Sequence, residues 1–281
     1  MARAVGRLTF PGAGQAYTAG ITGPTGSGKS TLTERLITKA RSEGSEVGVL
    51  AVDPSSPFSG GAFLGDRVRM QSHATDKGVF IRSMATRGHL GGLALATPEA
   101  IRVLDAAGLP WVLVETVGVG QVEIEVAGAA DTTLVVVPPG SGDAMQASKA
   151  GLLEAADVFV VNKADRPGAA ETRRDLEFML HLSAPGEGWT PPIVSAVAST
   201  GEGVDETWDA IAQHRKFLTD SGLLERRRAG RLAEEVRKIL VHRLEEQALQ
   251  RSRGPAFEEL LRDVVARRLD PYEAAAQLVD G

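Results

Sequence analysis

The sequence predicts an α/β protein with a doubly wound, mostly parallel sheet, followed by a helical C-terminal segment. Short apolar runs alternate with helical segments, the runs are apolar throughout, and strand signals stop near residue 219. Continuous apolar runs are typical of strands that are buried on both faces of a parallel sheet, and the alternation indicates right-handed crossover units. The expected strands are Tyr17–Thr22, Val47–Asp53, Val79–Ser83, Trp111–Thr116, Thr132–Val137, Val158–Asn162 and Pro192–Val194.

Helices are expected between these strands. Thr97 before Pro98 predicts an N-cap followed by proline at the first helical position, and Gly44 and Gly108 predict helix ends. The expected helices are Lys29–Glu43, Pro98–Ala107, Ala144–Ala155, Ala170–His181 and Val204–Leu218.

The C-terminal segment has a different character. From residue 223 onward, apolar residues recur at helical spacing among charges of both signs, which indicates amphipathic helices with solvated charged faces. Their apolar stripes need a partner surface, either the α/β domain or a second copy of the chain. We therefore expect a short N-terminal extension (residues 1–19), an α/β domain (20–218) and a helical arm (219–281).

Composition excludes several classes of function. The 281 residues include 31 Lys and Arg against 36 Asp and Glu, which gives a net charge of −5. A chain with this charge lacks the excess of basic residues that is typical of nucleic-acid binding proteins. The chain has no cysteine, which excludes a disulfide framework, a thiolate metal site and a cysteine nucleophile. The five histidines include no pair spaced as i and i+4, so a histidine metal site is not expected. The first 19 residues resemble neither a signal peptide nor a membrane span, and we expect a cytoplasmic protein that does not bind membranes.

A glycine-rich loop carries the strongest chemical signal. Gly23-Pro-Thr-Gly-Ser-Gly-Lys-Ser30 matches G-x-x-x-x-G-K-[ST] between an expected strand and an expected helix. In such a loop the backbone N–H groups surround phosphate oxygens, Lys29 reaches the β- and γ-phosphates, and the Ser30 hydroxyl can ligate Mg²⁺. The alternative is a glycine-rich turn without a ligand. The residues predicted to bind here are Gly26, Ser27, Gly28, Lys29, Ser30 and Thr31.

A second motif follows the strand that ends at Asn162. Asn162-Lys-Ala-Asp165 resembles the guanine-recognition motif of G proteins. In that reading Asp165 accepts hydrogen bonds from guanine N1–H and the 2-amino group, a donor pair that adenine lacks, and Lys163 lies along the base. The alternative is an ordinary strand-end turn. Ser195 and Ala196 resemble the short element that backs the guanine in the same proteins.

An acidic residue and a glycine mark a third motif. Glu115 ends an apolar strand and Gly118 follows three positions later, which resembles the Walker B and switch II element. Glu115 would position Mg²⁺, and the Gly118 N–H would meet the γ-phosphate. Gln121 lies three residues beyond Gly118, and it is either a water-orienting residue or a loop or dimer contact.

Two aspartates complete the expected machinery. Asp53 ends the strand after the glycine-rich loop and its helix, and Asp66 lies in a second glycine-rich segment, where the alternative is a helix N-cap. Carboxylates near a triphosphate act through Mg²⁺ or through a water molecule. The predicted metal ligands are Ser30, Asp53, Asp66 and Glu115, and the predicted catalytic residues are Lys29, Asp53, Asp66 and Glu115.

Taken together, V-D-P-S-S-P, G-G-x-x-L-G-D-R-x-R-M, E-T-V-G-V-G-Q and N-K-A-D resemble the MeaB/ArgK family, the G-protein chaperones of adenosylcobalamin-dependent methylmalonyl-CoA mutase. The resemblance runs from about Gly20 to the C-terminus, where R-L-D-P-Y-E-A-A is similar to the family's dimerisation arm. It implies a P-loop GTPase with Mg²⁺, GTP as substrate and GDP as product, no covalent cofactor, slow intrinsic turnover, a homodimer and a mutase partner.

The resemblance also implies a mobile segment, switch III, at Pro138–Lys149, where Asp143, Gln146 and Lys149 would face a partner. The alternative is an ordinary strand-to-helix connection with Asp143 as the N-cap. Two other functions compete with the chaperone. A maturation GTPase that delivers a metal predicts cysteine and histidine clusters, and a P-loop kinase of the ArgK transport-protein type predicts a phosphorylated acceptor and the use of ATP.

Overall fold

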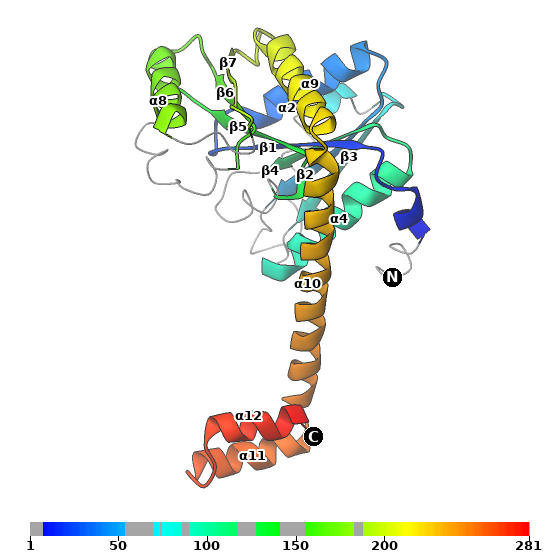
Figure 1. The fold of residues 1–281 in the computed structure, drawn as a ribbon, viewed down its shortest axis with the longest axis vertical. Helices are drawn as coiled ribbons and strands as arrows, with labels where there is room; N and C mark the ends of the chain where they lie inside the picture. Colours follow the sequence, from blue (N-terminus) through cyan, green and yellow to red (C-terminus); the bar gives the residue numbers. More distant parts are fainter. Residues whose placement is uncertain are drawn as a thin grey trace. The chain divides into compact units, whose positions relative to one another are not determined.

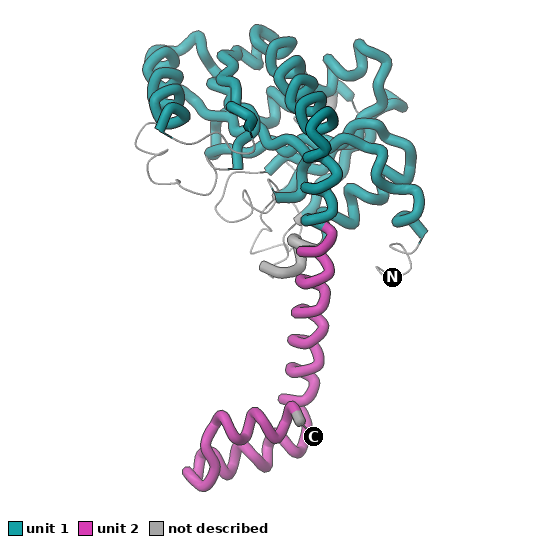
Figure 2. The backbone as a smooth tube through the Cα atoms, viewed as in Figure 1, with its two compact units in different colours: residues 1–231 teal, residues 232–281 magenta. Residues whose placement is uncertain are grey.

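A computed structural model describes residues 8–53, 70–73, 75–85, 90–116, 128–140, 155–182 and 188–280. It divides into two compact units, Met1–Arg231 and Leu232–Gly281, here called the globular unit and the helical unit (Figure 2). No helix among the described residues is both long enough and apolar enough to cross a membrane.

Seven strands form one sheet in the globular unit (Figure 1). Their order is β3-β2-β4-β1-β5-β6-β7, and each neighbouring pair is parallel. This confirms the predicted α/β fold with its parallel sheet. β3 and β7 run to Ala85 and Ala196, beyond their expected ends. The strands are β1 (Tyr17–Thr22), β2 (Val47–Asp53), β3 (Val79–Ala85), β4 (Trp111–Thr116), β5 (Thr132–Val137), β6 (Val158–Asn162) and β7 (Ile193–Ala196).

Helices cover both faces of the sheet (Figure 1). Trp111 and Leu113 of β4 join the apolar cluster beneath α2 (Lys29–Ser42) and α9 (Val204–Asp220). The alternate residues Val112 and Val114 face α4 (Leu90–Ala106), and on β5 the same alternation turns Val135 and Val137 toward α8 (Ala169–Leu182). Both faces are therefore buried, which is why the strands read as unbroken apolar runs.

Helix α4 corrects one expectation. It begins at Leu90 and continues through Pro98, so the N-cap expected at Thr97 is wrong. A proline has a helical φ angle and removes one backbone hydrogen bond, and the helix tolerates that loss because Leu104 packs into the apolar cluster with β2 and β4. The Thr97 hydroxyl is buried without a partner among the described residues. The expected helix Ala144–Ala155 lies outside the described residues, apart from its last residue.

Helices account for all the regular structure of the described C-terminal segment. They are α10 (Leu223–Arg251), α11 (Pro255–Val265) and α12 (Pro271–Asp280). Asp270 caps α12, because its carboxylate accepts a hydrogen bond from the Tyr272 N–H at 2.7 Å. Short 3-10 turns lie at Phe10–Gly12 (η1) and Gln71–His73 (η2).

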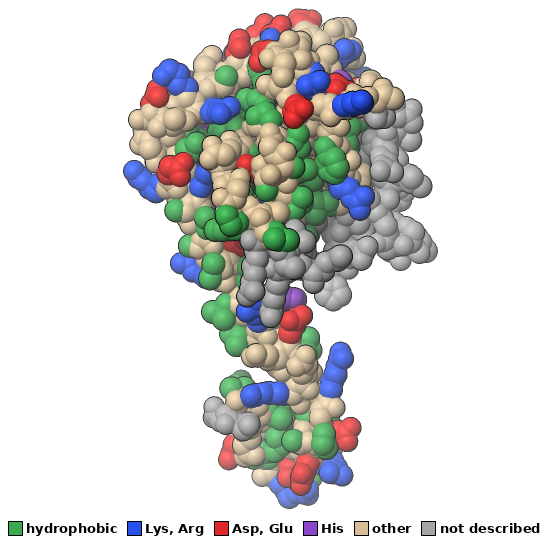
Figure 3. Space-filling model, turned by 90° about the vertical axis from the view of Figure 1, so that its right-hand side faces the viewer, with side chains coloured by type: hydrophobic (Ala, Val, Ile, Leu, Met, Phe, Trp, Pro, Cys, Tyr) green, Lys and Arg blue, Asp and Glu red, His purple; other side chains and the backbone are tan. Residues whose placement is uncertain are grey.

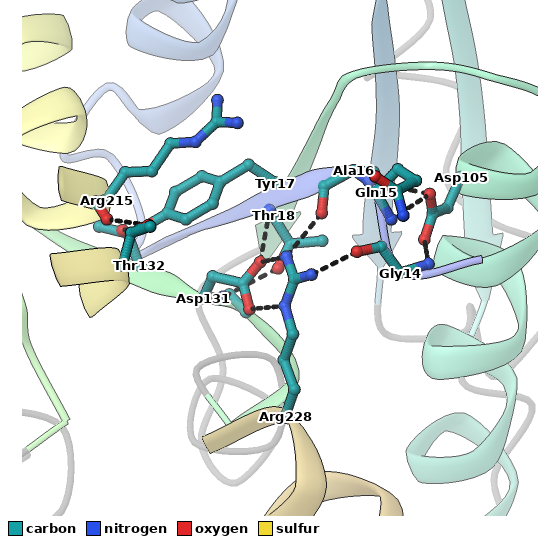
Figure 4. Close-up of polar contacts among 12 residues, drawn as sticks. Gly14, Gln15, Ala16, Tyr17, Thr18, Asp105, Asp131, Thr132, Arg215 and Arg228 are labelled. Carbon is teal, nitrogen blue, oxygen red and sulfur yellow. Dashed lines mark hydrogen bonds and ion pairs between the residues drawn. The ribbon is translucent and has the colours of Figure 1, made fainter. Parts of the chain in front are cut away.

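The segment that leads into β1 is held by the carboxylate of Asp105 on α4 (Figure 4). Asp105 accepts hydrogen bonds from the backbone N–H groups of Gly14, Gln15 (3.1 Å) and Ala16 (2.8 Å). Three successive backbone donors are thus satisfied at the point where the chain enters the sheet, which fixes the start of the central strand.

The first turns of α10 are bound to the same edge of the sheet. Arg228 donates to the carbonyls of Gly14 and Ala16 at 2.7 Å each and to the carboxylate of Asp131 at 2.6 Å (Figure 4). Asp131 precedes β5, is 1% exposed, and also accepts from the Thr18 N–H at 3.0 Å. Burial opposes the charge of Asp131, but the Arg228 hydrogen bond and the neighbouring arginine charges outweigh it and hold its pKa below the ordinary value.

Two further arginines on α10, Arg227 and Arg231, also bind carboxylates that precede strands. We call the ion pairs of Arg227, Arg228 and Arg231 the anchor of α10. Arg231 pairs with Asp131, and Arg227 lies 3.2 Å from the carboxylate of Asp157, which precedes β6. Their side chains are 26% and 29% exposed, against 19% for Arg228. The expectation of solvated charged faces is therefore wrong for these three arginines, which tie the start of α10 to the amino ends of β5 and β6.

A buried polar chain lies beside this anchor. The Thr132 hydroxyl lies 2.6 Å from Tyr17 Oη and 2.8 Å from His214 Nδ1, and His214 Nε2 is 3.3 Å from Asp157. Burial, with the charge of Arg227 as a second cause, lowers the pKa of His214 to about 3. The imidazole is therefore neutral at physiological pH.

This burial predicts an acid-sensitive fold. The pKa of His214 is lowered from 6.5 to about 3 on folding, so its stabilising effect is complete above pH 6.5 and is lost as the pH falls toward 3. The free energy of unfolding should therefore drop by about 1.4 kcal/mol per pH unit from this group between pH 6 and pH 4. His214→Gln keeps an acceptor for Thr132 and does not titrate. Urea unfolding of both proteins at a series of pH values should give a shallower slope for the variant, and equal slopes would contradict the assignment.

Candidate functional site

The predicted site residues that the structure describes lie at one edge of the sheet. The glycine-rich loop follows β1, Glu115 lies in β4, Asn162 ends β6, and Ala196 ends β7. Because all these strands are parallel, their carboxyl ends share one edge, which is where ligands bind in open α/β sheets.

Two glycines allow the loop to approach its neighbours. A Cβ at Gly23 would lie 2.1 Å from the Val136 carbonyl oxygen, and one at Gly28 would lie 2.3 Å from Asn162 Nδ2. Both residues also have positive φ angles, +134° and +90°, which side chains disfavour. Gly23 and Gly28 are thus required by close packing as well as by the path of the loop.

Lys29 places its charge inside this loop. The side chain is 6% exposed, and its Nζ donates to the carbonyl oxygens of Gly23 at 2.5 Å and Pro24 at 3.0 Å. Gly28 is the N-cap of α2 in the left-handed conformation, and Lys29, Ser30 and Thr31 form its first turn. The positive end of the helix and the ammonium group therefore converge on the loop, which suits a phosphate anion.

Ser30 and Glu115 form the candidate metal site. The Ser30 hydroxyl donates to Glu115 Oε1 at 2.6 Å, and Glu115 is 1% exposed. A hydroxyl and a carboxylate are the hard oxygen donors that Mg²⁺ prefers, so this pair fits the ion. The β2–β4 register pairs Ala51 with Glu115 and so places Asp53 two residues further along, at the same edge. Asp66 lies outside the described residues.

The Asn162 side chain joins two loops. Its Nδ2 donates to the Ser27 carbonyl at 2.8 Å, and its Oδ1 accepts from the Ala198 N–H at 3.1 Å. The residue is 2% exposed. One amide group thus connects the glycine-rich loop to the loop that follows β7.

The rest of the N-K-A-D motif lies against the same loops. Lys163 has a positive φ of +60°, which is uncommon outside glycine, and its Nζ donates to the Gly26 carbonyl at 2.7 Å. The Ala164 N–H donates to the Ala196 carbonyl at 3.0 Å, and the Asp165 side chain is exposed. The motif is therefore a formed turn with its carboxylate open to solvent.

The structure also shows contacts that sequence reasoning missed. Thr116 Oγ1 donates to Thr22 Oγ1 at 3.1 Å and ties the end of β4 to the end of β1. The strand-end threonines were a weak signal for this bond. Arg35 contacts the loop after β7, and no motif marked it. Several predicted residues lie outside the described residues, namely Gly118, Gln121, Asp143, Gln146 and Lys149.

The family is identified by comparison with known proteins. A family model described as methylmalonyl Co-A mutase-associated GTPase MeaB matches residues 1–253. The chain belongs to the MeaB family. It is therefore a P-loop GTP hydrolase, as the motifs predict.

Named relatives agree with this assignment. A Pyrococcus abyssi protein named as a GTPase is 51% identical over 99% of this chain and 87% of its own length. The GTPase ArgK of Escherichia coli is 40% identical over 82% of this chain and 70% of its own length. Among solved structures, that of a LAO/AO transport system kinase superposes with a TM-score of 0.73 at 30% identity, covering 98% of this chain and 84% of that one.

The contact at Gly28 gives a testable prediction. In Gly28→Ala the new methyl group collides with Asn162 Nδ2, so Asn162 must release the loop, and we expect the GDP Kd to rise at least tenfold, by about 1.4 kcal/mol or more. Gly44→Ala is the matched control, because Gly44 also has a positive φ, +79°, with open space around it. It should lower stability by about 1–2 kcal/mol without changing the GDP Kd. Calorimetric titration checks both, and equal GDP affinities in the two variants would disprove the Asn162 contact.

Proposed function

We propose that this MeaB-family GTPase is a cytoplasmic, Mg²⁺-dependent chaperone that couples its GTP cycle to the loading or protection of an adenosylcobalamin-dependent acyl-CoA mutase. The observation that carries the proposal is the match of a mutase-associated GTPase family to residues 1–253. The assembled loop, Glu115 and Asn162 support it, because together they give the family's nucleotide cycle a formed site.

Hydrolysis in this proposal depends on position and electrostatics. Water attacks the γ-phosphorus, the bond to the β–γ bridging oxygen breaks, and GDP and inorganic phosphate leave. Lys29 and the loop N–H groups stabilise the charge that develops on the bridging and γ-oxygens. Ser30 and Glu115 would hold Mg²⁺, with Asp53 and Asp66 as further ligands or water-positioning groups, and the ion would supply positive charge beside the phosphate oxygens.

Base selection rests on the N-K-A-D turn. Asp165 accepts hydrogen bonds from guanine N1–H and the 2-amino group, Lys163 lies along the base, and Ser195 with Ala196 backs it. Adenine lacks that donor pair, so the Asp165 carboxylate would lose its partners on binding ATP. The exposed position of Asp165 supports this role, since a base can reach it.

The guanine assignment predicts a specific loss in Asp165→Ala. We expect the GDP Kd of the variant to rise about a hundredfold or more, because each hydrogen bond to a charged group contributes about 1.5–3 kcal/mol, while ADP binding stays weak and unchanged. Competition against a fluorescent GDP analogue measures both. ATP binding as tight as GTP binding, or GDP binding that ignores the substitution, would refute the guanine site.

A transport-protein kinase is the second candidate, because one solved structure with 30% identity to this chain is that of a LAO/AO transport system kinase. A phosphate-release assay on the purified protein distinguishes the kinase from the GTPase. A GTPase releases inorganic phosphate from GTP with no acceptor present, whereas a kinase needs an acceptor that becomes phosphorylated.

The helical unit supports a homodimer. Its surface carries hydrophobic side chains among charged ones (Figure 3), including Val236 (66% exposed), Leu240 (56%) and Leu244 (55%) on α10. These residues recur every four positions and form one stripe along the helix. We propose that this stripe packs against a second copy, and that Gly118, Gln121, Asp143, Gln146 and Lys149 form the nucleotide-sensing and partner-facing segments.

Light scattering during size-exclusion chromatography tests both partners. The chain alone should have twice its mass of 29.6 kDa, and Leu240→Glu, which places a charge in the stripe, should shift it to the monomer. Mixed with methylmalonyl-CoA mutase and GTP, it should elute as a larger complex with faster phosphate release. A monomeric wild type contradicts the dimer. Separate elution with unchanged turnover contradicts the mutase chaperone.

A further inference from the structure

Arg35 on α2 reaches across to the loop that follows β7. Its Nε donates to the Ala198 carbonyl at 3.1 Å and its Nη2 to the Ser199 carbonyl at 2.8 Å. It lies six residues beyond Lys29, away from the phosphate-binding turn. The guanidinium therefore connects the helix that begins at the glycine-rich loop to the segment that follows the base-backing residues.

The loop after β7 has its own internal hydrogen bonds. The Val197 N–H donates to the Glu202 carbonyl at 2.9 Å, and the Val197 carbonyl accepts from the N–H groups of Thr200 and Gly201 at 3.0 Å each. A Cβ at Gly203 would lie 2.2 Å from the Ser195 carbonyl, so the end of the loop is packed directly on the base-backing strand. These bonds fix the shape of the loop, so contacts from other elements can fix its position as a whole.

The Ala198 residue is held by two such outside contacts. Asn162 Oδ1 accepts its N–H at 3.1 Å, and Arg35 Nε binds its carbonyl at 3.1 Å. Asn162 belongs to the base-recognition turn and Arg35 to the phosphate-side helix. The planar guanidinium can bind two successive carbonyls at fixed spacing, which a lysine ammonium does not reproduce.

We propose that Arg35 is a positioning residue for guanine recognition. The inference rests on the proposed role of Ser195 and Ala196 behind the base. By fixing Ala198 and Ser199 against α2, Arg35 holds the preceding residues at the distance that guanine needs. Loss of this contact lets the loop move away, and because base contacts require placement within a fraction of an ångström, the loss falls on base selection rather than on phosphate binding.

The test compares GDP and ADP affinities by competition with a fluorescent GDP analogue, with dissociation rates from stopped flow. In Arg35→Ala we expect the GDP Kd to rise about tenfold, mainly through faster dissociation, with the ADP Kd unchanged. Arg35→Lys should recover part of the preference, because one carbonyl keeps a partner. Arg41→Ala is the control, since Arg41 lies on the same helix and binds Asp76 at 2.9 Å and the Ser45 carbonyl at 2.9 Å, without contacting the loop.

Each outcome decides the proposal. A GDP-to-ADP ratio in Arg35→Ala equal to that of the wild type, or a ratio that falls as much in Arg41→Ala, overturns it. A parallel loss of GDP and ADP affinity also overturns it, because it assigns Arg35 to general stability. If Asp165→Ala abolishes the preference for GDP and Arg35→Ala does not, the guanine site stands and the positioning role falls. If the wild type has no preference for GDP, both fall together.

Discussion

The side-chain amide of Asn162 is the interaction on which the rest of the site depends. It donates to the glycine-rich loop at Ser27 and accepts from the loop after β7 at Ala198. The glycine-rich loop and the loop after β7, which lie about 170 residues apart in the sequence, are thereby held at a set distance. The amide can come this close because Gly28 has no side chain, so the motif glycine and the motif asparagine form one contact. In the function proposed above a nucleotide spans both loops, and this amide sets the distance between them.

Ion pairs hold the first turns of α10 at the amino ends of the strands, opposite the candidate site. Arg227, Arg228 and Arg231 bind the carboxylates that precede β5 and β6. A buried ion pair contributes little net stability by itself, whereas removing one partner leaves an uncompensated charge at a cost of about 3–5 kcal/mol. The anchor therefore acts mainly as a constraint on where α10 begins. These ion pairs place the first turns of α10 at the amino ends of β5 and β6.

Sequence reasoning located the strands and the motif residues because both are local signals. An apolar run of six residues is visible without its neighbours, and Gly23 to Ser30 has a fixed spacing. Pro98 was misread because a proline suits both the first turn and the interior of a well-packed helix, and packing on β2 and β4 decides between them. The arginines of α10 and Arg35 were missed because their partners lie 70 to 214 residues away in the sequence. A charged residue in a helical pattern favours the prediction of a solvated face. The pattern does not show the distant carbonyl or carboxylate that the fold places beside that residue.

The position of β1 has a consequence for how this chain acquires its function during synthesis. β1 precedes the other described strands in the chain and is the central strand of the sheet, yet its neighbours β4 and β5 begin at Trp111 and Thr132. A ribosome that has delivered only the first hundred residues has made the whole glycine-rich loop without either strand that supports it. Such distant pairings form slowly and expose apolar strands in the meantime. The glycine-rich loop therefore gains both strands that support it only after β5 has been made.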